Sequence, residues 1–146
     1  MADLTTSITE SVTINGQNRG STNSLTITGI EHTYERVVTI PSGSDSTVLL
    51  SKDTIASSDG AVDIQDTKYI RITNLDTTNT VNLSLQIDSG NDDSAADESC
   101  TISLQAGHSF VMGTPHDAIA VSDTNANIVT GMHDLESILV DSATQS

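Results

Sequence analysis

The chain has very few basic residues. Five Lys plus Arg stand against 20 Asp plus Glu, which gives the 146 residues a formal net charge of −15. Phosphate backbones repel such a chain, and no Lys/Arg cluster would bind them locally, so nucleic acid is excluded as a partner. Anionic membrane surfaces repel it for the same reason, and no run approaches the roughly 18 apolar residues of a membrane helix. The first residues lack a basic region followed by an apolar stretch, so we expect no secretory signal.

Cysteine and aromatic residues are also scarce. The single cysteine, Cys100, excludes an intrachain disulfide, and we expect its thiol to be a small buried apolar group. With no Trp, one Phe and two Tyr, the core must consist of Ile, Val and Leu, without the large burial that aromatic rings supply. Such a core is thin for a domain of this length. We therefore expect an oligomer, whose subunit interfaces supplement the core.

The residues in excess are β-branched. The 21 Thr, 14 Ile and 10 Val favour pleated sheet. Apolar and polar residues alternate in about ten short segments at spacings of roughly 8 to 12 residues, which is typical of a sandwich or barrel. The sequence predicts one all-β domain over residues 1–146, an antiparallel β-sandwich or jelly roll. Residues 1–7 and 141–146 are expected to be flexible or arm-like termini.

The individual strands follow from this alternation and from the turn residues between them. A strand containing Ile8, Val12 and Ile14 ends at Asn15-Gly16, a pair that supplies the positive φ angles of a tight turn. The segments 69–73 and 81–87 predict a hairpin closed by the polar turn 76–79. For residues 137–140 a helical turn over 133–139 is the alternative to a strand. The other predicted strands are 25–27, 34–40, 48–50, 62–64, 100–104, 109–112, 118–121 and 127–130.

The same alternation predicts the core. Side chains of one parity in a strand point to one face of the sheet, so the apolar parity of the strongest strands is expected to face inward. The residues concerned are Ile70, Ile72, Val81, Leu83, Leu85, Ile87, Ile102, Leu104, Phe110 and Met112.

Two patterns bear on catalysis. The segment Gly107-His108-Ser109-Phe110-Val111 begins like the Gly-x-Ser-x-Gly nucleophile elbow, but it ends in Val and lies between two predicted strands, so we interpret it as a β-turn. The histidines form neither a His-x-His pair nor a His-x-x-x-His pair, which favours solvated surface residues over a metal site. They are His32, His108, His116 and His133. These patterns predict no enzyme activity, no catalytic residue and no cofactor.

An acidic loop contains the candidate metal ligands. Oxygen-rich loops hold calcium in proteins, and Asp88, Asn91, Asp92 and Asp93 lie together between two predicted strands. The loop lacks the Asp-x-Asp-x-Asp-Gly spacing of an EF-hand. Calcium binding by these four residues is therefore an alternative to a solvated acidic loop. The sequence does not identify the residues of an interface with another protein.

Four segments resemble a known family. They read NLD at 74–76, VNLSLQID at 81–88, LQAGHSFVMG at 104–113 and HDLESILV at 133–140. Together they are similar to the small acidic virion structural proteins that marine tailed phages encode. The resemblance spans most of the chain and consists of overall style and short phrases, without a diagnostic site that transfers residue by residue. It implies an all-β component of the capsid or the tail.

The resemblance and the composition together predict a non-enzymatic structural protein of a phage particle. The leading hypothesis is a capsid decoration or cement protein that binds the major capsid protein on the outside of the head as a homotrimer, after synthesis in the host cytoplasm. Such a protein adds interface area across neighbouring capsomers, and many weak copies act together. The alternative is a tail, neck or fibre-associated module that binds tail or neck proteins. A carbohydrate-binding module for host attachment is the third hypothesis, with Tyr34 and Tyr69 as the available rings.

Overall fold

The computed structural model describes residues 1–52, 61–63, 67–87, 98–113 and 135–142 of the chain. Within these ranges the chain forms strands and no helix, so the predicted all-β class is confirmed and no helical membrane span is found. The strands are β1 (Ala2–Thr9), β2 (Thr13–Ile14), β3 (Gln17–Asn18), β4 (Thr22–Ile30), β5 (Asp45–Lys52), β6 (Ala61–Asp63), β7 (Tyr69–Thr73), β8 (Val81–Ile87), β9 (Glu98–Leu104), β10 (Ser109–Gly113) and β11 (Leu135–Ser142).

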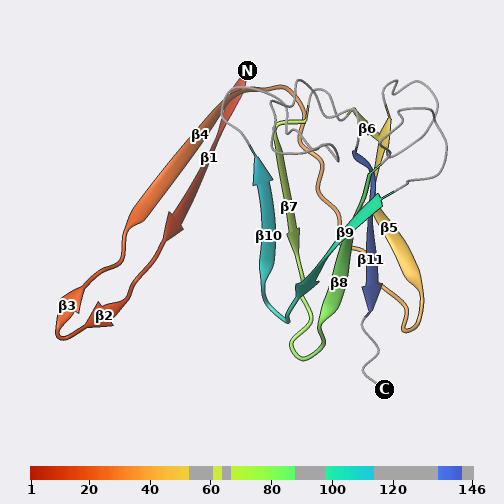
Figure 1. Cartoon of the computed structure of the whole chain (residues 1–146). Helices are drawn as coiled ribbons and strands as arrows, with labels where there is room; N and C mark the ends of the chain where they lie inside the picture. Colours follow the sequence, from red (N-terminus) through yellow and green to blue (C-terminus); the bar gives the residue numbers. More distant parts are fainter. Residues whose placement is uncertain (53–60, 64–66, 88–97, 114–134, 143–146) are drawn as a thin grey trace.

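The largest unit is a five-stranded sheet with the strand order β6-β5-β11-β8-β9 (Figure 1). Its neighbouring strands are antiparallel except β5 and β6, which run parallel. β7 and β10 form a separate antiparallel ribbon that packs on one face of this sheet. We call β5 to β11 together the body. Its described strands form one sheet and one ribbon, and the predicted sandwich or jelly roll stays a prediction.

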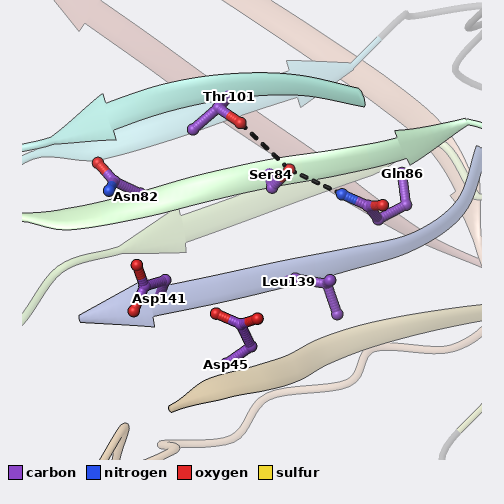
Figure 2. Close-up of a pocket in the computed structure, with 7 residues that line it drawn as sticks. All are labelled: Asp45, Asn82, Ser84, Gln86, Thr101, Leu139 and Asp141. Atoms are coloured by element: carbon purple, nitrogen blue, oxygen red, sulfur yellow. Dashed lines mark hydrogen bonds between the residues drawn. The ribbon is translucent and has the colours of Figure 1, made fainter. Parts of the chain in front are cut away.

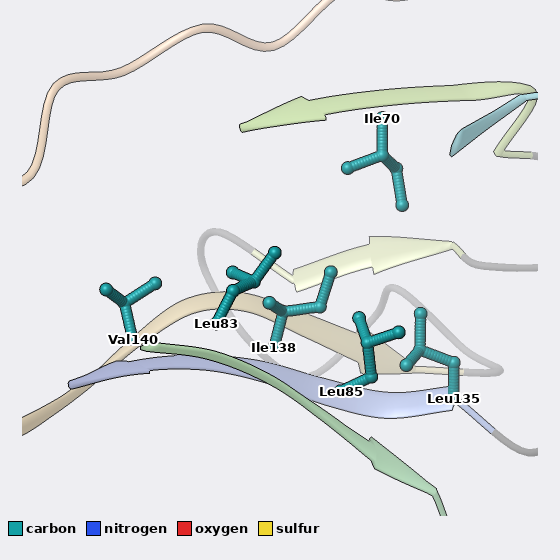
Figure 3. Packing of buried hydrophobic residues seen from close by; sticks show 6 residues of the cluster. All are labelled: Ile70, Leu83, Leu85, Leu135, Ile138 and Val140. Carbon is teal, nitrogen blue, oxygen red and sulfur yellow. The ribbon is translucent and has the colours of Figure 1, made fainter. Parts of the chain in front are cut away.

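The core lies between the ribbon and the sheet, where Ile70 of β7 points toward the buried residues of β8 and β11 (Figure 3). β11 keeps Leu135 on the same face as Ile138 despite their odd spacing, because the register shifts between Leu135 and Ser137. The predicted core is confirmed in two groups. The buried members are Ile70, Leu83, Leu85, Ile87 and Leu104. The half-buried members are Ile72, Val81, Ile102, Phe110 and Met112.

The predicted hairpin of 69–73 and 81–87 is wrong, although both strands have the predicted bounds. β7 pairs with β10, whereas β8 pairs with β9 and β11. The turn between β7 and β8 therefore leads the chain from the ribbon to the five-stranded sheet. The turn between β9 and β10 returns it to the ribbon at the same end of the body (Figure 1).

Asn74 determines where the chain passes between the two layers, and its side chain is the buried polar group of the described residues. Its Nδ2 donates to the carbonyl oxygen of Asn79 at 2.8 Å and to that of Leu104 at 3.0 Å. Its Oδ1 accepts the N–H of Asp76 at 3.1 Å. Two of these bonds fold the turn after β7, and the third joins that turn to the end of β9. Because the amide is buried, losing these partners would leave polar groups unpaired at a substantial cost.

The backbone of Asn74 is bound to the second turn. Its N–H donates to the carbonyl oxygen of His108 at 3.0 Å, and its carbonyl oxygen accepts the N–H of Gly107 at 2.9 Å. The second turn is closed by the bond from His108 N–H to Gln105 O at 3.1 Å, and Gly107 has the positive φ of 73° that such a turn requires at its third position. The predicted β-turn, in which Gly107 supplies the turn geometry, is confirmed, and β10 begins directly after it at Ser109.

Asp76 closes the first turn from its exposed side. Its Oδ1 accepts the N–H groups of Thr78 at 2.7 Å and of Asn79 at 2.8 Å, and its Oδ2 accepts Asn79 Nδ2 at 3.1 Å. These donors favour the charged carboxylate, so the pKa of Asp76 is lowered, most of all by the backbone bond from Asn79. The stabilising effect of this carboxylate is therefore present above its usual pKa and is lost as the pH falls through the lowered value.

Residues 1–30, which we call the arm, extend away from the body (Figure 1). β1 pairs with β4 antiparallel, and β2 pairs with β3 in the same register beyond them. The tip is the predicted turn, with Asn15 at φ 52° and Gly16 at φ 77°. Among the described strands, those of the arm pair with each other and with none of the body. Near the base, Lys68 Nζ donates to the carbonyl oxygen of Thr28 at 3.4 Å. The arm is thus much longer than the arm-like terminus 1–7 that the sequence predicts.

Two further expectations are wrong. The segment 34–40 is not a strand: the guanidinium of Arg36, instead of the backbone, binds β5, with bonds to the carbonyl oxygens of Thr47 at 3.3 Å and Val48 at 2.6 Å. Cys100 is exposed instead of buried. It lies on β9, the outermost strand of the described sheet. At alternate positions of this strand Leu104 is buried, Ile102 is half-buried and Cys100 is exposed.

The C-terminal segment adopts a strand and not the alternative helical turn. β11 covers the predicted strand 137–140 and extends to residue 142, so residues 141–142 belong to the sheet instead of a free terminus. The predicted strands 118–121 and 127–130 lie outside the described residues, as does the segment 143–146.

Replacing Asn74 by Ala should lower the free energy of unfolding by about 2–4 kcal/mol, because three hydrogen bonds are lost and the buried carbonyl oxygen of Leu104 loses a donor. Urea denaturation measures this loss. Asn79→Ala is the matched control, because the Asn79 side chain is exposed and makes a single bond to Asp76. Equal losses in the two variants would contradict the role assigned to Asn74.

Candidate functional site

The outer face of the five-stranded sheet, opposite the core, contains an open depression of about 460 Å³ (Figure 2). It exists because the strands alternate: while the apolar residues of β8 face the core, its polar residues face outward. The depression spans β5, β11, β8 and β9 and is lined mainly by amide, hydroxyl and carboxylate groups. The lining residues are Asp45, Asn82, Ser84, Gln86, Thr101, Leu139 and Asp141.

Hydrogen bonds order one end of this depression, and two carboxylates lie at the other (Figure 2). Ser84 Oγ accepts from Gln86 Nε2 at 2.7 Å and from Thr101 Oγ1 at 3.3 Å. Asp45 and Asp141 are direct cross-strand partners. Like charges directly opposite each other destabilise a sheet. This face is therefore rich in acceptors, and two of its carboxylates belong to directly opposed residues.

The chemistry of the depression fits weak contact with hydroxyl-rich or cationic groups. A sugar site usually stacks an aromatic ring on its ligand, and no ring is among the lining residues. Tyr34 is exposed with the Arg36 guanidinium 5.7 Å from its ring centre, and Tyr69 is half-buried on β7, in the other layer of the body. Neither ring suggested by the sequence is therefore part of the depression.

The histidines and acidic residues singled out in the sequence form no cluster where they are described. His32 is exposed beside the arm, and His108 lies in the turn before β10, with its Nδ1 2.9 Å from Ala106 O. His116 and His133 lie outside the described residues, and so do Asp88, Asn91, Asp92 and Asp93, the calcium candidates. In the part of the chain that the structure describes, no group of three or more His, Cys, Asp or Glu side chains is placed to hold a metal ion.

The arm presents two faces of different character. On one face three pairs of hydroxyl groups bond across the strands: Thr5 with Thr26 at 3.4 Å, Ser7 with Ser24 at 2.8 Å, and Thr9 with Thr22 at 3.2 Å. Each hydroxyl of this row therefore has a partner within the arm. The hydroxyl groups of this polar face therefore do not need another protein as a hydrogen-bond partner.

The opposite face of the arm carries its apolar side chains, with polar residues among them: Asn23 is the cross-strand partner of Ile8, and Gln17 is that of Ile14. The residues of the other parity in β1 and β2 lie on it, together with their partners in β4 and β3. At the base Ile27 is completely buried, opposite Leu4. Toward the tip the apolar side chains are exposed, at 61% for Ile8, 49% for Val12 and 54% for Ile14. The sequence alone predicts a strand containing these three residues, and it does not identify them as a contact surface.

Exposed apolar residues are concentrated at the N-terminal end of the chain. Nine large apolar side chains are exposed among the described residues, and only Leu75 and Val111 belong to the body. The other seven lie within the first 38 residues: Met1, Ile8, Val12, Ile14, Tyr34, Val37 and Val38. This concentration makes the arm and the segment that follows it the strongest candidate for a contact surface.

Comparisons of the chain with protein family models, with curated proteins and with solved structures give no match.

Asp141→Asn should raise the free energy of unfolding by about 0.2–1 kcal/mol, because it removes one of two opposed carboxylates. The gain should shrink between about 10 mM and 0.5 M salt, as screening weakens the repulsion in the unsubstituted chain. Glu31→Gln changes the net charge equally at an exposed position outside the sheet and serves as the control in urea denaturation. If Asp141→Asn stabilises the chain no more than the control does, the two carboxylates do not repel each other significantly.

Proposed function

We propose that the chain is a non-enzymatic structural protein of a phage particle, specifically a decoration protein on the exterior of the head. Its partner is the major capsid protein, its working form is a homotrimer, and it is made in the host cytoplasm. The observation that supports this proposal best is the concentration of exposed apolar side chains in the first 38 residues, outside the body. An exposed apolar surface of this kind is typical of a protein that works through contacts with other proteins.

The arm and the body have different surfaces, and this difference suits such a role. The body packs its apolar residues between ribbon and sheet, and it exposes polar and acidic groups that keep it soluble. The arm extends beyond the body, so it reaches a neighbouring protein without disturbing the core (Figure 1). Many copies, each with a modest interface, stabilise a shell collectively.

The same arrangement also suits a tail, neck or fibre-associated module, which differs from a decoration protein in copy number and position. The carbohydrate-binding hypothesis draws support from the polar depression alone, and its lining contains no aromatic ring. We therefore propose the decoration role first and the tail or neck role second.

Copy number in purified particles distinguishes these roles. Quantitative mass spectrometry, with the major capsid protein as the internal standard, should find hundreds of copies of this chain per particle if it decorates the head. A dozen copies or fewer would contradict decoration and support the neck or tail. Absence from washed particles would overturn the structural role altogether.

A further inference from the structure

We propose that the apolar face of the arm binds the arm of a second copy of this chain. This face includes Leu4, Ile8, Val12 and Ile14 on one strand of the arm, with Leu25 and Ile27 on the other. It is distinct from the depression on the body. The inference deepens the proposed function and rests on it for its biological purpose, because it identifies the contact that holds the subunits together.

The arm needs a partner for physical reasons. An isolated two-stranded ribbon is at best marginally stable in water, and a third layer or strand is normally required. Only the base of the apolar face is covered, where Ile27 is completely buried, while Ile8 and Ile14 are more than half exposed. Exposed strand edges are usually protected by Lys or Pro, and residues 1–30 contain neither. The arm therefore has the properties of an element that is covered in the assembled protein.

The distribution of charge favours another arm as the occupant. Residues 1–30 contain two acidic and one basic residue, a net charge of −1, so the other 116 residues carry −14 of the total −15. Two bodies in contact would repel each other strongly. Two arms in contact bring together nearly neutral surfaces and leave the bodies apart. Among the contacts that two copies can make, arm against arm therefore has the least repulsion.

The two charges near the tip make the apolar face self-complementary. Glu10 and Arg19 continue the register of this face between the two strand pairs: Glu10 N–H donates to Ser21 O at 2.8 Å, and Arg19 N–H donates to Val12 O at 2.7 Å. Within the arm each has a neutral partner: Arg19 Nη2 donates to Gln17 Oε1 at 3.0 Å, and Glu10 Oε2 accepts from Ser21 Oγ at 3.4 Å. Each arm thus offers one acid and one base to a second arm, which has the same pair to offer in return.

Light scattering on the purified full chain tests the contact. At about 0.5 M NaCl, where repulsion between bodies is screened, the unsubstituted chain should have two or three times the 15.3 kDa mass of one chain. The mass should fall toward that of a monomer at a few mM salt. Ile8→Ser combined with Ile14→Ser should be monomeric at both salt concentrations with an unchanged β-type circular dichroism spectrum. Val111→Ser, an apolar-to-polar change at an exposed site of the body, should keep the oligomer.

A charge exchange identifies the partner as a second arm. Glu10→Arg and Arg19→Glu each give an arm with two like charges, so each variant alone should associate at least tenfold more weakly than the unsubstituted chain. An equimolar mixture of the two variants should associate more strongly than either variant alone, because each arm supplies the charges that the other lacks. The double variant Glu10→Arg/Arg19→Glu should recover the oligomer, because each of its arms again carries one acid and one base.

The inference is overturned if the unsubstituted chain is monomeric at every salt concentration, or if the Ile8/Ile14 variant keeps the oligomeric mass. It is also overturned if the mixed charge variants do not associate better than either alone. Because these measurements use the isolated protein, their failure leaves the copy-number test of the particle unaffected. A failure of the copy-number test likewise leaves the contact between arms standing.

Discussion

The fold of the body depends on one buried amide. Asn74 binds the turn after β7 through Asn79, the end of β9 through Leu104, and the turn before β10 through its own backbone. The two turns are the places where the chain moves between ribbon and sheet. Because Asn74 joins them, the ribbon is held over the apolar face of the sheet, and the core residues of β7 and β10 meet those of β8 and β11.

The residues of the core cluster all belong to the body, where they pack between the ribbon and the sheet. The outer face of that sheet is polar and includes two opposed carboxylates. Apolar side chains that remain exposed are found mainly before residue 39, on a part of the chain with little net charge. Most of the net charge and most of the exposed apolar side chains therefore lie on different parts of one chain. The proposed structural role rests on this separation.

The sequence predicts the strands and the core well because both depend on local alternation. β7 and β8 have the predicted bounds, and all ten expected core residues are buried or half-buried. Strand pairing is less predictable because it depends on distant partners. The expected hairpin of β7 and β8 is not formed, because β7 pairs with β10 and β8 pairs with β9 and β11, all of which lie farther along the chain. The exposure of Cys100 likewise depends on the position of β9 at the edge of the described sheet.

The sequence contains a local signal for the long hairpin of the arm, and this signal lies in the Ser and Thr residues instead of the apolar ones. Ser or Thr occupies positions 5, 7 and 9 and positions 22, 24 and 26, which are symmetric about the Asn15-Gly16 turn. Such symmetry predicts a hydroxyl row across a long hairpin, and the row is present. It also implies that the alternate residues form the opposite face. The polar depression had no comparable signal, since its residues come from four strands whose order is not local.

The central claim is that copies of the chain meet through their arms. Hydrogen–deuterium exchange, compared between a few mM and about 0.5 M salt, locates the contact directly, because amides in a newly covered ribbon open less often. We expect slower exchange at high salt within residues 4–14 and 17–27, and unchanged exchange in β8, an interior strand of the sheet. Protection gained in the body, with the arm unchanged, would contradict the central claim.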